Sequence, residues 1–268
     1  MKNKYILPII IAAGSVLMTT SCTDYAQSEP EMVSPVTFKG SVWDYLETEH
    51  PDMKFDSIKA IVEEIPELKA QLTNNSEGFT FFAPTDASVR HAIEALNVYR
   101  KSNKIGKPVY LRDLMIEPFE VEDTIVRVNP LTLENDTTFS YRKYDYRLQL
   151  DSLVSRYAFS DRVLANDVIS TGGRIKMSTS RYTQEMILES GRHDAYGASE
   201  AGVKYLYLIE SNGSNMQSSW VKAEAVKRDI ETENGIIHVL SDSHEFGFNL
   251  FIKKFKDRGT EKGVKTIL

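Results

Sequence analysis

The pattern of hydrophobic and polar positions divides the chain into a helical first part and a strand-rich second part. In the first part, apolar residues at helical spacing predict short helices from Ser41 to His50, over residues 58–65 and from Pro66 onward. The uncharged run Phe79–Phe82 follows, and its composition is typical of a strand buried on both faces.

The pattern changes sharply after this strand. Pro84 brings no N–H and therefore ends the strand ladder. Thr85 and Asp86 can each accept hydrogen bonds from the free N–H groups of a helix that begins at Ala87 and runs to about Arg100.

The segment between about residues 102 and 147 alternates with the strand period in two places. Residues 124–128 and 137–141 are the alternating runs, and turn-forming residues separate them. They predict a protruding two-stranded hairpin. Because an isolated hairpin is marginal in water, we expect it to pack on the rest of the protein or on a partner.

Further strand-like runs dominate the second part, after a helix over residues 148–157. They lie at residues 174–178, 184–189, 203–210, 221–230 and 236–240. Asn234-Gly235 predicts a hairpin turn between the last two, because this pair tolerates positive φ. The order of elements predicts a mainly antiparallel β assembly that closes over the earlier helices.

Two of these stretches also carry motifs. Phe79–Val89 resembles the first signature of the fasciclin domain, and Asn234–Ser241 is similar to the second. The resemblance implies one α+β domain over residues 36–255: mainly antiparallel β-sheets with N-terminal helices packed against them, plus a hairpin inserted at about 102–147. We expect the two signatures to pack side by side as scaffold. The family structural residues are Pro84, Thr85, Asp86, Asn234, Gly235 and His238, the last of which is expected to be buried and hydrogen-bonded.

The ends of this domain resemble a narrower group. The opening Ser41–Leu46 and the ending His244–Phe248 look like those of fasciclin-domain lipoproteins from glycan-foraging Gram-negative bacteria. Such lipoproteins are often associated with an outer-membrane transporter and a substrate-binding lipoprotein. Tyr157-Ala158 departs from the Tyr-His pair that many fasciclin domains carry, so adhesive roles ascribed to that pair do not carry over.

The first residues read as an export signal. Lys2 and Lys4 precede an apolar run over residues 5–18, which is too short to span a bilayer and is typical of a signal peptide. Small residues before Cys22 resemble a lipobox, which implies that residues 1–21 are cleaved and that Cys22 is lipidated. The alternative is an ordinary secretory signal with an incidental cysteine.

This anchor sets the predicted location. Residues 22–35 are polar and predict a flexible tether, so the protein is expected at the outer membrane, held by lipid and facing the cell surface. Cys22 is the single cysteine of the chain, which excludes an intrachain disulfide.

The net charge of the chain limits the classes of partner that it is expected to bind. The 268 residues include 32 basic and 38 acidic ones, a net charge of −6, and loss of residues 1–21 with their two lysines makes it −8. An acidic surface argues against nucleic acid as a partner. Residues 256–268 form a basic tail, which we expect to be solvated.

Motifs for catalysis or cofactor binding are missing from the sequence. There is no nucleophile elbow, phosphate-binding glycine loop or zinc-protease motif, and the five histidines do not cluster. We therefore expect no enzyme activity, no cofactor and no metal. A hydrolase that uses scattered carboxylates remains an alternative, because spatial pairs of acids cannot be recognised in a sequence.

Aromatic residues give the candidate binding contacts. They lie at the exit of the hairpin and in a glycine-rich loop of the second part, and they are Tyr141, Tyr144, Tyr146, His193 and Tyr196. Exposed rings can stack on sugars or anchor protein interfaces, whereas half-buried core tyrosines are the alternative.

The sequence thus predicts a lipid-anchored, non-catalytic binding or adhesion module at the outer membrane, accessory to a glycan-uptake system. Its expected partner is an extracellular glycan or a complex of transporter and substrate-binding lipoprotein. The alternative is a purely structural accessory subunit of an outer-membrane complex.

Overall fold

The computed structural model describes residues 36–74, 78–128, 131–132, 135–261 and 264–267. The helices are α1 (Val42–Glu47), α2 (Asp56–Glu63), α3 (Pro66–Thr73), α4 (Asp86–Ser102), α5 (Tyr146–Val154), α6 (Ala165–Ser170) and α7 (Phe251–Phe255), with 3-10 turns η1 (Leu111–Asp113), η2 (Ser155–Tyr157) and η3 (Gln217–Ser219). The strands are β1 (Val36–Thr37), β2 (Phe79–Ala83), β3 (Phe119–Val128), β4 (Asn135–Tyr144), β5 (Ala158–Phe159), β6 (Arg174–Ser178), β7 (Glu185–Arg192), β8 (Lys204–Glu210), β9 (Val221–Glu231), β10 (Gly235–Leu240) and β11 (Val264–Ile267). Cys22, the signal peptide and the tether lie outside the described residues.

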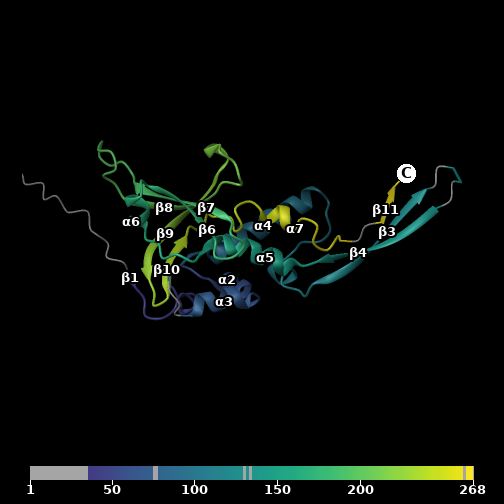
Figure 1. Ribbon diagram of the computed structural model, residues 1–268, viewed down its shortest axis with the longest axis horizontal. Coiled ribbons are helices and arrows are strands. Elements are labelled where there is room, and N and C mark those ends of the chain that lie inside the picture. Colours follow the sequence, from purple (N-terminus) through teal and green to yellow (C-terminus); the bar gives the residue numbers. More distant parts are fainter. Residues whose placement is uncertain (1–35, 75–77, 129–130, 133–134, 262–263, 268) are drawn as a thin grey trace, which may run out of the picture. The chain divides into compact units, whose positions relative to one another are not determined.

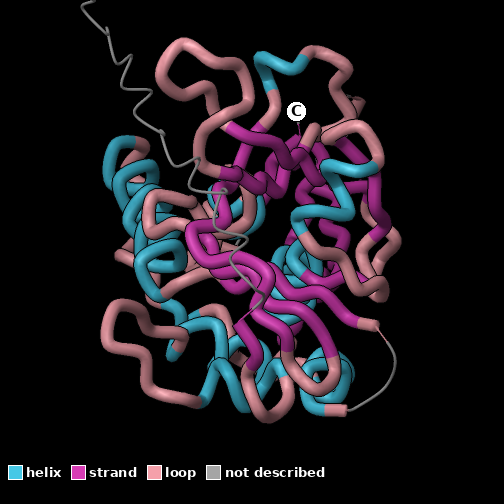
Figure 2. The backbone as a smooth tube through the Cα atoms, turned by 90° about the vertical axis from the view of Figure 1, so that its left-hand side faces the viewer, coloured by secondary structure: helices cyan, strands magenta, loops and turns pink. Residues whose placement is uncertain are grey.

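Eight strands form one large sheet, and β1 and β6 to β10 are labelled in Figure 1. Strands β5, β2, β10, β9, β8, β7 and β6 lie side by side in that order, and β1 also pairs with β9. A bridge between Phe159 and Thr179, and a 2.9 Å hydrogen bond from the Ser180 N–H to the Ala158 carbonyl, link the two ends of this order. The sheet is therefore nearly closed, with helices around the strands (Figure 2). The predicted α+β class, with a mainly antiparallel sheet, is confirmed.

The two signature stretches are neighbours within this sheet. Strands β2 and β10 are parallel, with Phe79 opposite Gly235 and Ala83 opposite Val239. Every residue of both strands is buried. The prediction that the two stretches pack side by side is confirmed, and they form the centre of the core.

The helices before β2 follow their local sequence signals. The Ser41 hydroxyl accepts the Asp44 N–H at 3.1 Å, and the Asp44 carboxylate accepts the Ser41 N–H at 2.7 Å, which makes a reciprocal cap for α1. Ile58 and Ile61 of α2 and Leu68 of α3 are fully buried in the core. The predicted helices are confirmed, although α1 ends at Glu47, earlier than expected.

One predicted cap is wrong. Thr85 does cap α4, because its hydroxyl accepts the Ser88 N–H, at 3.5 Å. Asp86 is already the first residue of α4, and its carboxylate instead accepts the Ser57 N–H of α2 at 2.7 Å. Phe55, the residue before α2, gives that helix no side-chain cap, so an acid from a helix remote in sequence supplies it.

The chain reverses direction between β9 and β10 where the sequence predicts it, but the predicted cause of the reversal is wrong. Neither Asn234 nor Gly235 has a positive φ. The Asn234 side chain accepts the Val42 N–H at 2.8 Å and donates to the Leu72 carbonyl at 2.9 Å. Gly235 begins β10, where a Cβ atom would lie 2.4 Å from the Phe79 carbonyl oxygen. Both residues therefore allow segments that are remote in the sequence to pack closely.

A second sheet of three strands contains the predicted hairpin, which is longer than expected. Its order is β11-β3-β4, with β3 and β4 antiparallel and β11 parallel to β3. Residues 256–268 were predicted to be a solvated tail. That prediction is wrong for Arg258 and Glu261, whose side chains are largely buried at the base of the hairpin, and residues Val264–Ile267 form β11.

Candidate interaction surface

The hairpin offers an open strand edge. Strand β4 is the outer strand of its sheet, and no strand of the described residues pairs with its other side. The backbone N–H and C=O groups along that side therefore have no ladder partner within the described chain. Such an edge is a ready template for a strand from another molecule.

One face of the hairpin carries exposed rings. Phe139 and Tyr141 alternate along β4, so both point to the same face, and they are 59% and 67% exposed. The Tyr141 hydroxyl donates to the Glu122 carboxylate on β3 at 2.9 Å. This hydrogen bond raises the pKa of Tyr141 and holds its ring in place. Phe139 and Tyr141 are called the hairpin aromatic face below.

The other predicted tyrosines have a different role. Tyr146 is only 3% exposed, so the expectation of an exposed contact is wrong for it. Tyr144 is half-buried, and its ring lies 5.7 Å from the Phe119 ring and 6.2 Å from the Tyr146 ring, centroid to centroid. These rings join the hairpin to the core.

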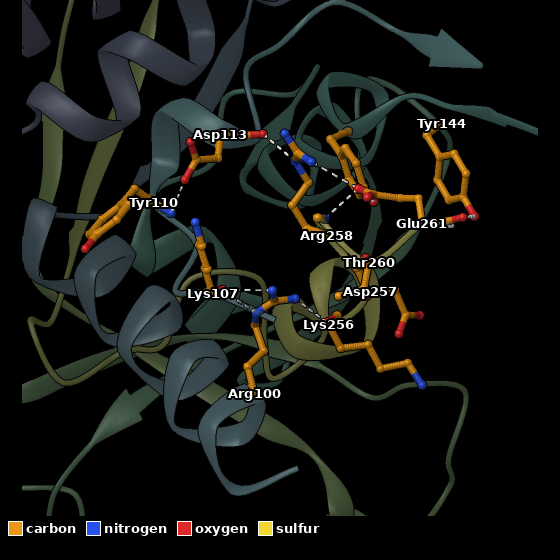
Figure 3. Close-up of polar contacts among 12 residues, drawn as sticks. Arg100, Lys107, Tyr110, Asp113, Tyr144, Lys256, Asp257, Arg258, Thr260 and Glu261 are labelled. Atoms are coloured by element: carbon orange, nitrogen blue, oxygen red, sulfur yellow. Dashed lines mark hydrogen bonds and ion pairs between the residues drawn. The ribbon is translucent and has the colours of Figure 1, made fainter. Parts of the chain in front are cut away.

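Two tail residues complete this junction (Figure 3). The Arg258 guanidinium lies 5.3 Å from the centre of the Tyr146 ring, and it donates to the Asp113 carbonyl at 2.8 Å and to the Glu261 carboxylate at 3.1 Å. The same carboxylate accepts the Tyr146 hydroxyl and the Gly259 N–H, both at 2.7 Å. Together these residues form the hairpin base cluster.

The base cluster shifts the pKa values of its own groups. Burial alone would raise the pKa of Glu261, but the hydrogen bonds from Gly259, Tyr146 and Arg258 outweigh it and lower the pKa. Burial, and next the hydrogen bond to Glu261, raise the pKa of Tyr146. The carboxylate is therefore ionised and the phenol neutral, as an ion pair with Arg258 requires.

The remaining predicted contacts lie in the loop between β7 and β8. Tyr196 is fully exposed, and Tyr196 and Gly197 have φ values of 52° and 79° between the paired residues Ala195 and Ala198. A tyrosine at positive φ costs about 1 kcal/mol, so the turn holds this ring out against a local penalty. His193 is also exposed, and its ring lies against Tyr205. No hydrogen bond, ion pair or ring contact joins this loop to the hairpin within the described residues.

His238 is a structural residue, as predicted. It is fully buried, its Nδ1 accepts the Asp229 N–H at 3.1 Å, and its Nε2 donates to the Val163 carbonyl at 3.0 Å. Burial lowers its pKa, which keeps the ring neutral. With both nitrogens occupied by backbone groups, His238 is not available as a base or a metal ligand.

A second buried histidine was missed. The Tyr157 hydroxyl accepts the Gly247 N–H at 2.8 Å and shares a hydrogen bond with Nε2 of His244, also at 2.8 Å. Burial lowers the pKa of His244 to about 3. This pair packs in the core against Phe246 and Phe248. In the part of the chain that the structure describes, no three His, Cys, Asp or Glu side chains gather closely enough to hold a metal ion.

Sequence reasoning also missed Phe139, Glu122 and the base cluster. Phe139 could have been found, because the strand period places it on the face of Tyr141. Glu122 follows from the hairpin register, which pairs it with Tyr141. Arg258 and Glu261 carry no local signal, since their partners lie more than 100 residues earlier in the chain.

Comparison with known proteins gives a weak structural likeness. No family model and no curated protein matches the chain. Among solved structures, it is similar to a FAS1 domain pair from the insect cell adhesion molecule fasciclin I, with 12% sequence identity and a TM-score of 0.35. The match covers 72% of this chain and 45% of that chain, and a likeness of this size carries no argument about function. Among the helices described, none has the length and apolar character to cross a membrane.

Proposed function

We propose that the protein is a non-catalytic binding module that docks a protein partner through the outer edge and aromatic face of the hairpin. The observation that carries this proposal is the exposure of Phe139 and Tyr141 beside the unpaired edge of β4. Exposed rings next to free backbone groups suit a partner that supplies both a strand and apolar side chains.

The fixed base of the hairpin supports this role. A hairpin held at one end by Arg258 and Glu261 presents a preordered surface, so less conformational entropy is lost when a partner binds. A sugar ligand would use the rings but not the row of backbone groups. The geometry therefore favours a protein over a glycan at this surface.

The setting that we propose for this module is the outer membrane. Lipidation of Cys22 and the polar tether would hold the domain at the cell surface, in an adhesive assembly or as an accessory to a glycan-uptake complex. The partner would then be a component of that complex, and anchoring would raise its effective concentration.

Site-specific photocrosslinking tests the proposal. A photoreactive phenylalanine analogue is placed at position 139 of the full chain in its native cells, and at the exposed helix position Val98 as a control. We expect position 139 to give one discrete membrane-protein adduct that position 98 does not give. Phe139→Ser/Tyr141→Ser, probed with the analogue at position 143 of the same face, should remove it.

Two controls make the outcome decisive. The double variant should unfold at the same urea concentration as the wild type, because both rings are exposed. Cys22→Ser should release the protein from the membrane and weaken the adduct while leaving purified fold and stability unchanged. An adduct that persists in the Phe139/Tyr141 variant, or equal adducts at positions 98 and 139, would contradict the hairpin as the docking surface.

A further inference from the structure

We propose that an open cavity beside α7, lined mainly by polar and charged residues, binds an acidic sugar. The cavity has a volume of about 770 Å³, which is within the range of small-molecule sites. Segments far apart in the sequence form its wall: α5, η2, the start of β7, the end of β8 with the turn after it, and α7. This site is separate from the hairpin, so the inference does not rest on the proposed docking function.

A buried ion pair forms part of the wall. The Glu210 carboxylate accepts Nε of Arg156 at 3.0 Å and the Asn212 N–H at 2.9 Å, and the two side chains are only 9% and 12% exposed. Arg156 also donates from Nη1 to the Ser152 carbonyl at 2.6 Å. Its Nη2 has no hydrogen-bond partner among the described residues. The pair thus holds a rigid donor at the cavity without adding net charge.

Two side-chain amides can either donate or accept a hydrogen bond at the cavity. Gln149 and Gln184 both line the cavity, and the Gln184 carboxamide oxygen is buried without a hydrogen-bond partner in the described chain. Its backbone is anchored, because its N–H donates to the Thr179 hydroxyl at 3.0 Å. Nothing described fixes the orientation of the amide itself, so it can present either its oxygen or its NH₂ to a ligand.

The charge of the cavity favours an anion. Lys253 and Lys254 on α7 line it, and neither forms an ion pair with a described residue. The remaining acid of the wall, Glu185, is already paired with Lys176 at 2.7 Å. The two ammonium groups are therefore the unbalanced charges, and a carboxylate on the ligand would complement them.

The rest of the wall favours a polyhydroxylated ligand. Of the described residues that line the cavity, Leu250 alone has an apolar side chain, and none is aromatic. An inorganic anion would leave most of the volume and the amides unused. Sugar hydroxyls match Gln149, Gln184 and Ser211, and a carboxylate on the same molecule matches the lysines.

Calorimetric titration of the detergent-solubilised full chain tests the inference. The probes are digalacturonate, neutral digalactose and sodium acetate, at low ionic strength. We expect digalacturonate to bind at least about tenfold more tightly than digalactose, because a charge-assisted hydrogen bond contributes that much discrimination. Acetate should bind far more weakly than either. Equal binding of the two sugars, equal binding of acetate, or no binding at all would overturn the proposal.

Variants locate the site. Lys253→Gln/Lys254→Gln should weaken digalacturonate binding by about tenfold. Lys101→Gln/Lys104→Gln is the matched control, because it removes the same charge from exposed lysines outside this cavity and should leave the affinity unchanged. Equal losses of affinity in both double variants would show that the lysines act only through long-range attraction of the anion, which would contradict a site at the cavity. Gln184→Leu keeps the charge and removes the amide, so it should lower affinity for both sugars and leave the fold intact.

Discussion

The central strand pair β2–β10, which is parallel, and the hairpin β3–β4, which is antiparallel, are both regular strand pairs but have opposite roles. Both faces of β2 and β10 are covered, and β5 and β9 occupy their outer edges. The hairpin has ten residues in each strand, yet Phe139 and Tyr141 are exposed and the outer edge of β4 is open. Neighbouring elements, and not strand length or regularity, decide which pair becomes scaffold and which becomes surface.

The polar groups of the two regions differ in the same way. In the scaffold, Asn234 and His238 bond to backbone groups of remote segments and are fully used. In the hairpin, Tyr141 bonds to Glu122 on the neighbouring strand, and the contacts to the rest of the protein lie at the base, around Arg258 and Glu261. Changes in the scaffold should therefore alter global stability, whereas changes at the base should alter the hairpin alone.

The largest effect is expected from Asn234→Ala. The change leaves the buried Val42 N–H and the Leu72 carbonyl without partners, so it should lower the free energy of unfolding by about 3 kcal/mol. Urea unfolding followed by circular dichroism measures this loss. Asn166→Ala, at an exposed asparagine, is the control and should change stability by less than about 0.5 kcal/mol. Equal effects would show that the amide network is not a feature of the scaffold.

Acid should weaken the scaffold next. The pKa of His244 is lowered from 6.5 to about 3 by burial, so the folded state binds its proton less readily than the unfolded state. Its contribution is present above pH 6.5 and is lost as the pH falls towards 3. At pH 5 the loss amounts to about 2 kcal/mol, and the lowered pKa of His238 acts in the same direction.

Urea midpoints at pH 7.5 and pH 5 measure this acid effect. His244→Gln removes one titrating ring and should reduce the difference between the two midpoints, whatever its effect on stability at pH 7.5. Working above pH 5 keeps the ordinary titration of carboxylates out of the range. A pH dependence that is unchanged in the variant would contradict the assignment to His244.

The smallest effect on global stability is expected from Arg258→Leu. The change removes the cation between Glu261 and the Asp113 carbonyl, so we expect the local stability of the hairpin to fall by about 1 kcal/mol while the free energy of global unfolding changes little. Hydrogen exchange should accelerate in the amides of β3 and β4 and stay unchanged in β2 and β10. Arg90→Leu, at an exposed arginine, is the control. Uniform acceleration in all four strands would show that hairpin and scaffold open together.

Local signals in the sequence were sufficient for most of the scaffold. Ser41 and Thr85 cap helices that begin beside them, and residues 174–178 form β6 with the predicted bounds. Each of these features depends on residues within a few positions of one another. Periodicity and capping chemistry record such short-range interactions directly.

Features that join remote segments were not predictable in the same way. Asp86 caps a helix that begins 30 residues earlier in the chain, and Tyr146 is buried because Glu261 and Arg258 reach it from the far end of the chain. The cavity beside α7 needs five segments at once. The periodicity of nearby residues does not predict such contacts between remote segments, since they depend on the topology of the completed fold.

The position of β10 in the large sheet also has a kinetic consequence. Residues Gly235–Leu240 lie between β2 and β9, so neither neighbour has its full set of partners until a segment near the end of the chain arrives. The parallel pairing with β2 joins residues more than 150 positions apart, and such non-local contacts slow folding. During synthesis, the ribosome must therefore release most of this chain before its core can close.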